Sequence, residues 1–191
     1  KKTVLLYGMK YMPLRDEFRI HNEKIERKKQ IMITMGGTDP YHITLGVVRQ
    51  MLNETLLDEY SIVAVLGKMN HDKEKLDELA KTNTQLMVLQ NISNMGEVMR
   101  QSCLAVCAGG ASVYELCACQ TPTVCVAFAE DHVSFAKKME KHQILNYAGD
   151  VQEDPVGVQK YIIDLLVDLA DDEAKQKIYR EHMQALVDGN G

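Results

Sequence analysis

Short apolar segments alternate along this chain with segments whose apolar residues recur at helical spacing. The apolar segments are rich in Val, Ile, Leu, Met and Cys, and their lengths are typical of β-strands. Runs such as Ile31–Met35 and Leu104–Ala108 are almost continuously apolar, which indicates strands that are buried on both faces. Strands are therefore predicted at Thr3–Tyr7, Gln30–Met35, Ser61–Gly67, Thr84–Gln90, Cys103–Ala108, Thr121–Phe128 and Ile144–Gly149.

The segments between these strands have the periodicity of amphipathic helices. The charged segment Arg15–Lys29 is instead expected to be a surface connection. Alternating strands and helices are typical of repeated βαβ units, so we predict an α/β fold. It is expected to be a doubly wound, Rossmann-like parallel sheet with a pair of C-terminal helices. Helices are predicted at Ile43–Asn53, Asp72–Thr82, Asn94–Ser102, Ala111–Gln120, His132–His142 and in two stretches between Pro155 and Val187.

Length and charge limit the possible classes of protein. A chain of 191 residues suits one hydrophobic core, so residues 1–191 are predicted to form a single domain. The net charge of −5 argues against a nucleic-acid partner, because proteins that bind the phosphate backbone usually carry a basic face. No apolar run approaches the roughly 20 residues that a membrane span requires. Because the chain does not begin with Met, we expect it to be a piece of a longer protein.

The cysteines indicate core packing and a reducing compartment. There are 5 of them, an odd number, and most lie within apolar or helical patterns. Free cysteine behaves as a small buried hydrophobe, so a cytoplasmic location is expected. Cys117 and Cys119 form a CxC pair, but a helix directs such side chains to different faces. Since no second Cys/His pair lies at the spacing of a zinc site, we predict no metal.

Candidate binding chemistry lies in the loops that follow the predicted strands. In an open parallel sheet, ligands bind outside the carboxyl ends of the strands. The loops Gly36–Pro40 and Gly109–Ser112 both begin with Gly-Gly and lead into a helix. Glycine permits close approach of a ligand to the backbone, and a helix N-terminus offers free N–H groups to an anion. Either loop alone could be a tight structural turn, but two at one sheet edge favour phosphate binding.

The loops match no standard nucleotide motif, since the chain has neither a GxxxxGK[ST] P-loop nor a GxGxxG dinucleotide fingerprint. Glu115 follows Ser112 by three residues, which is the spacing of a helix capping box. Alternatively, the Glu115 carboxylate one turn into the helix could accept hydrogen bonds from the paired hydroxyls of a sugar. Both interpretations of Glu115 remain open at this point.

Four segments in order resemble a known family: "YMPLRDEF" (11–18), "GGTDP" (36–40), "NISNM" (91–95) and "AGGASVYELCACQTPTV" (108–124). Together they resemble the C-terminal domain of GT-B fold proteins. The resemblance is strongest to the UDP-sugar hydrolase of the pseudaminic acid pathway and its spore-coat polysaccharide relatives. A more distant resemblance is to the glycosyltransferase that forms lipid II. In these proteins the C-terminal half holds the nucleotide of a UDP-sugar, and no cofactor is implied.

The resemblance also implies roles for individual residues. Glu115 would bind the ribose hydroxyls, and the backbone of Asn91, Ile92 and Ser93 would face the uracil. The histidine that activates water belongs to the N-terminal half of the hydrolase, which this chain lacks. We therefore expect an N-terminal GT-B domain as partner and no activity from this chain alone. No catalytic residue is predicted within this chain. The diphosphate would contact Gly109, Gly110, Ala111 and Ser112, and Gly36, Gly37 and Thr38 would lie near the phosphates at the cleft between the halves. Gly67, in the loop after the predicted strand Ser61–Gly67, is a further candidate for nucleotide binding.

One position departs from the pattern of the hydrolase-like proteins. These proteins usually carry Asn-Gln after the strand that corresponds to Thr121–Phe128, where the amides can reach the sugar. This chain has Asp131 and His132, which are candidates for sugar contact with different hydrogen-bonding and charge properties. Alternatively, Asp131 could be a helix N-cap and His132 an exposed helix start.

Three functions remain open from the sequence. The first is the UDP-binding half of a hydrolase-like enzyme in surface polysaccharide or nonulosonate sugar biosynthesis. The second is the donor domain of a glycosyltransferase, and the third is a nucleotide-sugar-binding module without turnover. The sequence does not separate hydrolysis from transfer, because that choice depends on the acceptor side.

Overall fold

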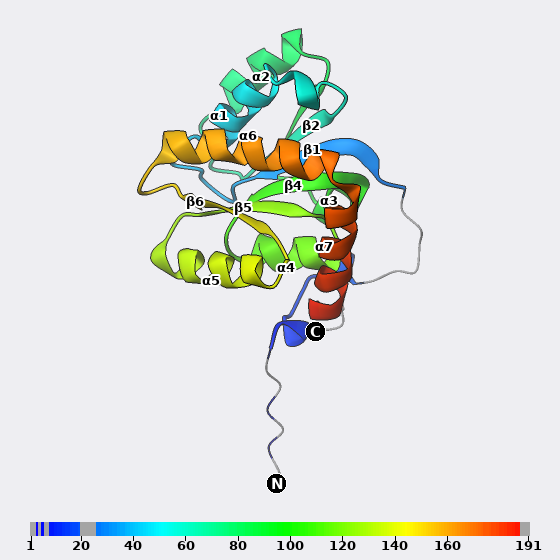
Figure 1. Cartoon of the computed structure of the whole chain (residues 1–191). Coiled ribbons are helices and arrows are strands. Elements are labelled where there is room, and N and C mark those ends of the chain that lie inside the picture. Colours follow the sequence, from blue (N-terminus) through cyan, green and yellow to red (C-terminus); the bar gives the residue numbers. More distant parts are fainter. Residues whose placement is uncertain (1–2, 4, 6–7, 20–25, 188–191) are drawn as a thin grey trace.

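The structure, a computed structural model, describes residues 3, 5, 8–19 and 26–187 (Figure 1). Its centre is one sheet of six parallel strands in the order β3–β2–β1–β4–β5–β6. The strands are β1 (Lys28–Thr34), β2 (Ser61–Leu66), β3 (Leu86–Gln90), β4 (Ser102–Ala108), β5 (Thr123–Ala127) and β6 (Asn146–Asp150). These six strands confirm the predicted ones. The seventh, Thr3–Tyr7, falls mainly on residues outside the described ones.

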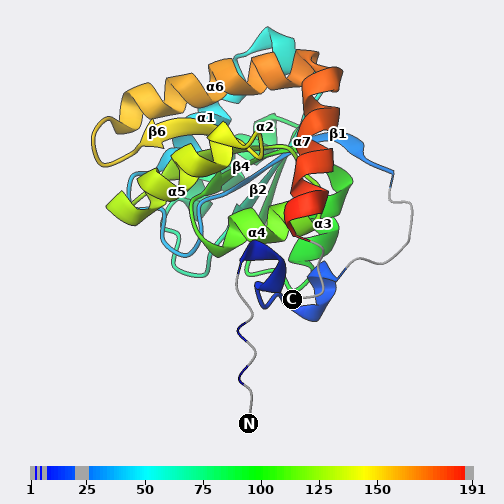
Figure 2. The ribbon, with the colours of Figure 1, turned by 60° about the horizontal axis from the view of Figure 1, so that its bottom comes forward.

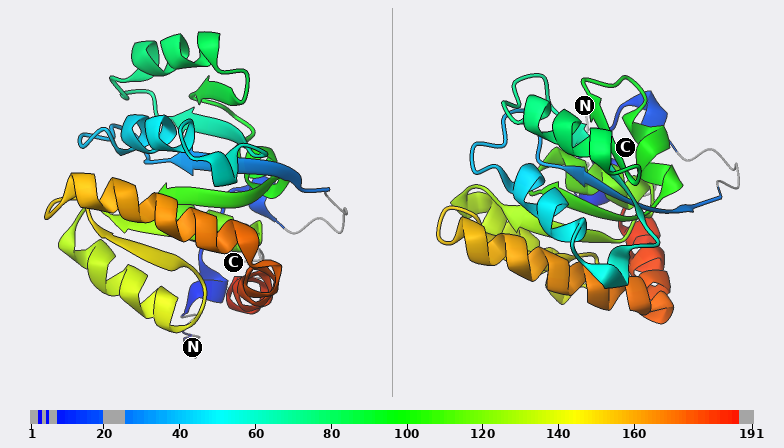
Figure 3. Two further views of the ribbon diagram at one scale, coloured as in Figure 1. Left: turned by 45° about the horizontal axis from the view of Figure 1, so that its top comes forward. Right: turned by 90° about the horizontal axis from the view of Figure 1, so that it is seen from above.

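Helices cover both faces of the sheet, as predicted for a doubly wound fold (Figures 1 and 3). The first face carries α1 (Ile43–Met51), α2 (Lys73–Thr82) and α6 (Pro155–Asp171), which share one apolar core with the sheet. The second face carries α3 (Met95–Gln101), α4 (Ala111–Ala118) and α5 (Glu130–Lys141), which share the other core (Figure 2).

The last helix, α7 (Glu173–Leu186), joins the two layers at one edge of the sheet. Its Tyr179 packs into the first core, while its Met183 packs into the second. The Tyr179 hydroxyl also donates a hydrogen bond of 2.7 Å to the buried Asn146 side chain of β6. Of the predicted C-terminal helical pair, α6 therefore packs on the first face of the sheet, and α7 contacts both cores.

The strand order places the loops after β1 and β4 next to each other. The chain first builds β1, β2 and β3 outward in one direction, and then crosses back through α3 to place β4 beside β1. Two βα loops consequently diverge from the point where the strand order reverses. Such a reversal is the usual place for a ligand in an open α/β sheet.

The described residues on either side of 20–25 are tied into the protein, which corrects the predicted surface connection over Arg15–Lys29 for those residues. Residues 20–25 of that prediction lie outside the described ones. Phe18 lies in the short 3-10 helix η2 (Asp16–Phe18) and is only 1% exposed in the second core. The Arg27 guanidinium is partly buried, and burial lowers its pKa. It donates hydrogen bonds to the carbonyl oxygens of Arg100, Ser102, Cys119 and Gln120, and to the Thr121 hydroxyl. The charge of the segment concealed this anchoring role.

Replacing Arg27 with Ala is expected to lower the free energy of unfolding by about 3 kcal/mol, because several carbonyl groups would lose their donor. Urea denaturation followed by circular dichroism measures this change. The matched control is Lys28→Ala, since the neighbouring Lys28 makes only an exposed bond to Gln101. Equal stability of the Arg27→Ala and Lys28→Ala variants would contradict the anchoring role.

Candidate functional site

A cavity of about 500 Å³ lies where the loops after β1, β4 and β5 meet. It is therefore at the carboxyl edge of the sheet, at the reversal of strand order. Six of the predicted site residues line it, and six further residues join them. The predicted ones are Gly36, Thr38, Gly109, Ala111, Ser112 and His132, and the others are Met35, Pro40, Tyr41, Ala108, Phe128 and Gln152.

The turn from β4 into α4 presents an open helix N-terminus to this cavity. Gly110 is the N-cap residue with φ of 130°, a conformation that side chains rarely adopt, and no side chain caps the helix. The preceding Gly109 amide is used by the fold, because it donates to the Val126 carbonyl oxygen at 2.8 Å. The first amides of an uncapped helix lack intrahelical acceptors and attract anions. The local geometry thus suits a phosphate group.

The capping box that the spacing of Ser112 and Glu115 suggested does not form. Ser112 is the second residue of α4 rather than its N-cap, and no side-chain cap is present at this helix start. Glu115 instead accepts a hydrogen bond of 3.1 Å from Arg15. Glu115 lies outside the lining of the cavity, one turn further along α4 from Ser112.

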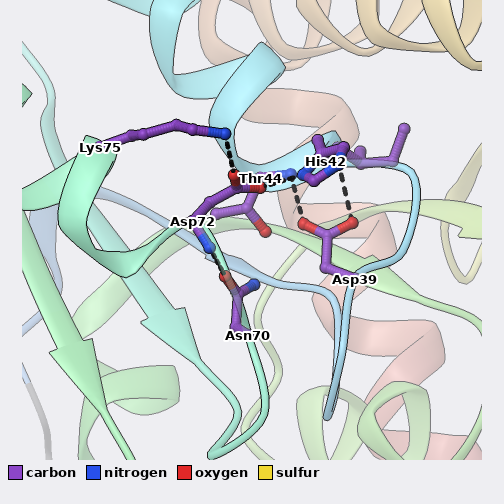
Figure 4. A network of polar contacts seen from close by, with 7 residues as sticks. Asp39, His42, Thr44, Asn70, Asp72 and Lys75 are labelled. Carbon is purple, nitrogen blue, oxygen red and sulfur yellow. Dashed lines mark hydrogen bonds and ion pairs between the residues drawn. The ribbon is translucent and has the colours of Figure 1, made fainter.

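The second expected phosphate cradle, at the start of α1, is already occupied by a carboxylate (Figure 4). Asp39, only 2% exposed, accepts hydrogen bonds from the amides of Ile43 at 2.9 Å and Thr44 at 2.8 Å. An anionic ligand would have to displace this charge. The Gly36–Pro40 loop therefore contributes a wall to the cavity, with Gly36 at φ of 76°, but not an open helix N-terminus.

Gly67 is a contact between loops rather than part of the cavity lining. A Cβ atom at this position would clash with the carbonyl oxygen of Gly36 and would lie 2.5 Å from Gly37 Cα. The absence of a side chain lets the loop after β2 support the loop after β1. Gly37 faces the loop after β2, because a Cβ atom built on Gly37 would lie 3.9 Å from the Met69 side chain. Gly37 does not line the cavity.

A polar network also connects the start of α1 with the loop after β2 and adds to this support (Figure 4). His42 pairs through Nδ1 with Asp72, which is buried and also accepts from Lys75 at 2.9 Å. The Asp72 amide in turn donates to the Asn70 side chain at 2.8 Å. Burial alone would raise the pKa of Asp72, but its bonds to Lys75 and His42 bring that pKa below the usual value. No role was predicted for these residues from the sequence.

His132 packs directly on the turn that precedes α4. Its Cβ lies 2.9 Å from the position that a Cβ of Gly109 would take, so only glycine fits beneath it. Its Nε2 lies 3.9 Å from the corresponding position of Gly110. Its Nδ1 is shielded from solvent and has no hydrogen-bond partner among the described residues. The alternative of an exposed helix start is therefore wrong for His132.

Asp131 is exposed and lies inside α5 rather than at its cap. The helix begins at Glu130 after the N-cap residue Ala129, and no side chain makes a cap bond there. The alternative interpretation of Asp131 as an N-cap is wrong, and Asp131 does not line the cavity.

The predicted uracil-contacting residues follow β3 and lie outside the cavity lining. Asn91 adopts a left-handed backbone with φ of 52°, and its amide donates to the Leu66 carbonyl oxygen at 3.1 Å. Asn91 and Ser93 are exposed, while Ile92 packs against the second core. The loop is separated from β1 by β2, so any contact with a ligand would be made at the far end of an extended molecule.

The cysteines occupy packing positions, as predicted. Cys107, Cys117, Cys119 and Cys125 are buried in the second core, and all five thiols are free. Burial raises the pKa of Cys117 to about 12, which keeps this thiol protonated and unreactive. The part of the chain that the structure describes contains no group of three or more His, Cys, Asp or Glu side chains placed to hold a metal ion.

None of the described helices has the length and apolar character needed to cross a bilayer.

Two curated proteins are similar in sequence. An uncharacterized protein of Methanocaldococcus jannaschii, MJ1062, is 31% identical over 123 residues, which are 60% of this chain and 25% of that protein. The spore coat polysaccharide biosynthesis protein SpsG of Bacillus subtilis is 23% identical over 138 residues, 71% of this chain and 41% of that protein. The matches therefore span less than half the length of either relative.

Solved structures share the fold at low sequence identity. WaaG, a glycosyltransferase involved in lipopolysaccharide biosynthesis, matches with a TM-score of 0.64 and 13% identity over 87% of this chain and 44% of that one. The C-terminal domain of the group 1 glycosyltransferase LpcC from Francisella tularensis matches with a TM-score of 0.60 and 16% identity over 85% of each chain. The second match is to a C-terminal glycosyltransferase domain alone, and it covers most of both molecules.

Residues 31–185 match the glycosyltransferase family 28 C-terminal domain, from the first core residues of β1 to the end of α7. This range includes both Gly-Gly loops, the cavity between them and the C-terminal helices α6 and α7. The chain belongs to the glycosyltransferase family 28 C-terminal domain family, and its fold is that of the C-terminal half of a GT-B protein.

Proposed function

We propose that this chain binds the UDP part of a nucleotide sugar and acts as the donor half of a GT-B enzyme. The observation that carries the proposal is the cavity in which the uncapped N-terminus of α4, the Gly110 turn and the wall of the β1 loop come together. Such a helix start suits an anionic group such as phosphate. Membership of the family supports a nucleotide sugar as the source of that phosphate.

Each part of UDP would lie at a different part of the site. The diphosphate would contact the turn Gly109–Ser112, with the loop Gly36–Thr38 opposite and Gly67 supporting that loop. The ribose would extend along α4 toward Glu115, and the uracil toward the backbone of Asn91–Ser93. His132, which lies over the turn, would contact the phosphate or the attached sugar, with Asp131 at the rim.

For the reaction, we favour a UDP-sugar hydrolase-like enzyme of surface polysaccharide or nonulosonate sugar biosynthesis. The similarity to a spore coat polysaccharide biosynthesis protein supports that setting. The alternative of a glycosyltransferase donor domain is supported by the shared fold. In either case the residue that activates the acceptor is expected in the N-terminal half. The chain by itself would then bind UDP without turnover, and its free thiols suit a reducing cytoplasm.

The proposal predicts that the chain binds UDP at least tenfold more tightly than uridine, because the diphosphate gains charge-assisted hydrogen bonds from the α4 amides. Isothermal titration calorimetry of both ligands measures the two affinities. Similar affinities for UDP and uridine would remove the basis for a phosphate site at this turn.

The Glu115→Gln variant is expected to bind UDP roughly tenfold more weakly, since hydrogen bonds from hydroxyls to a charged acceptor are stronger than those to a neutral one. Its melting temperature should change little, because Glu115 does not complete a helix cap. Glu181→Gln on the exposed face of α7 serves as the control for loss of a carboxylate. Unchanged UDP affinity in Glu115→Gln would exclude the ribose contact.

His132 is expected to donate a hydrogen bond to phosphate through Nε2, because Nδ1 is shielded from solvent while Nε2 lies over the turn, 3.9 Å from the position that a Cβ of Gly110 would take. The His132→Leu variant should therefore lose roughly tenfold in UDP affinity. The His132→Gln variant, which keeps an N–H donor, should stay close to wild type. Calorimetry on both variants makes the test, and equal losses in the two would count against the donor role.

A further inference from the structure

Arg15 connects the segment that precedes β1 to the helix that carries Glu115. Its Nη2 donates to Glu115 Oε1 at 3.1 Å, and its Nη1 pairs with Glu17 Oε1 at 2.8 Å. The guanidinium also lies 5.0 Å from the centre of the Phe18 ring. Two carboxylates and one aromatic ring therefore fix the position of a single cation, although 56% of its side chain is exposed.

The backbone beside Arg15 is held just as firmly by α3. The Gly96 amide donates to Glu17 Oε2 at 2.8 Å, and Arg100 donates to the Glu17 carbonyl oxygen at 2.6 Å. A Cβ on Gly96 would lie 2.8 Å from that same carbonyl oxygen, so glycine lets the segment dock closely on the helix. With Phe18 buried as well, Arg15 extends from a rigid support rather than from a loose loop.

Glu115 needs such a partner if it is to accept hydrogen bonds. Burial raises the pKa of Glu115, Arg15 acts against that rise, and the nearby Glu17 adds to it. Arg15 uses only Oε1, and Oε2 has no hydrogen bond from any described residue. One oxygen of the carboxylate is thus fixed by the protein, while the other can accept from a ligand.

We propose that Arg15 is a positioning residue for ribose recognition, holding Glu115 so that its Oε2 accepts the ribose hydroxyls and selects ribonucleotides over 2′-deoxyribonucleotides. This inference rests on the proposed binding of UDP. An exposed ion pair usually contributes little to stability, so a merely structural Arg15–Glu115 pair would have no effect that depends on the 2′-hydroxyl.

The test is the ratio of affinities for UDP and 2′-deoxyuridine diphosphate, measured by calorimetry on the 191-residue chain and its variants. Wild type should favour UDP by about tenfold, the value expected for one hydrogen bond to a charged acceptor. Arg15→Ala and Glu115→Gln should both reduce the ratio to about two or less. Arg15→Lys should give an intermediate ratio, because it keeps the charge but loses the fork that contacts both carboxylates.

Arg19→Ala is the matched control. Arg19 belongs to the same segment, but it pairs only with the exposed Asp16 at 3.1 Å and makes no contact with Glu115. Its ratio should equal that of wild type. Melting temperatures of all variants establish that they are folded.

The possible outcomes separate the inference from the proposed function. If wild type does not bind UDP, the proposed function fails. If wild type binds UDP and Glu115→Gln loses the ratio while Arg15→Ala keeps it, Glu115 contacts ribose without Arg15 and the inference is wrong. An equal loss of both affinities in Arg15→Ala, with the ratio intact, also overturns it.

The dependence on pH provides a second readout. Removal of Arg15 takes away the charge that opposes the rise in the pKa of Glu115, and leaves Glu17 as the remaining charged neighbour. Glu115 should then become protonated at a higher pH, so the preference for UDP that remains in Arg15→Ala should be lost at a higher pH than in wild type. Identical pH profiles for the ratio in the two proteins would contradict the positioning role.

Discussion

The return of the chain from β3 to a position beside β1 is the constraint on which the rest of this structure depends. Because β4 pairs with β1 rather than with β3, the loops after these two strands start side by side and lead to opposite faces of the sheet. The space between them cannot be filled by either helix layer, and the cavity forms there. The candidate contacts to phosphate lie at this point of reversal, and the predicted contacts to uracil lie two strands away, after β3. The location of the site is thus a consequence of strand order, before any side chain is considered.

Within this frame the two glycine-rich loops have different tasks, although their sequences look alike. The loop after β1 carries its own anion, Asp39, on the amides of α1, and it is supported by Gly67 and by the His42–Asp72 pair. The loop after β4 carries no such charge and leaves the start of α4 open. One loop is therefore an ordered wall, and the other is the candidate anion site. A site whose walls are already ordered loses less entropy on binding, which favours affinity without additional contacts.

The sequence predicted most of the fold because its elements are encoded locally. Continuous apolar runs gave the six strands, with ends that differ from the observed ones by about two residues, as at Gln30–Met35 against Lys28–Thr34. The errors occurred where partners are distant in the chain. Nothing near Arg27 shows that its acceptors include Cys119 and Gln120, and nothing near Glu115 indicates Arg15. Asp39 was different, because an Asp shortly before a predicted helix is a recognisable capping signal that could have been used.

The spacing of Ser112 and Glu115 shows why local sequence spacing does not predict the hydrogen bonds at the site itself. A capping box requires the serine to be the N-cap, but here Gly110 holds that position with a backbone that only glycine adopts readily. The helix therefore starts two residues earlier than the motif implies, and Ser112 moves into the first turn beside the cavity. Glu115 is then released from a local partner and can pair with Arg15 on a separate segment. The unusual conformation of one glycine thus opens the helix start to an anion and frees the carboxylate one turn further along.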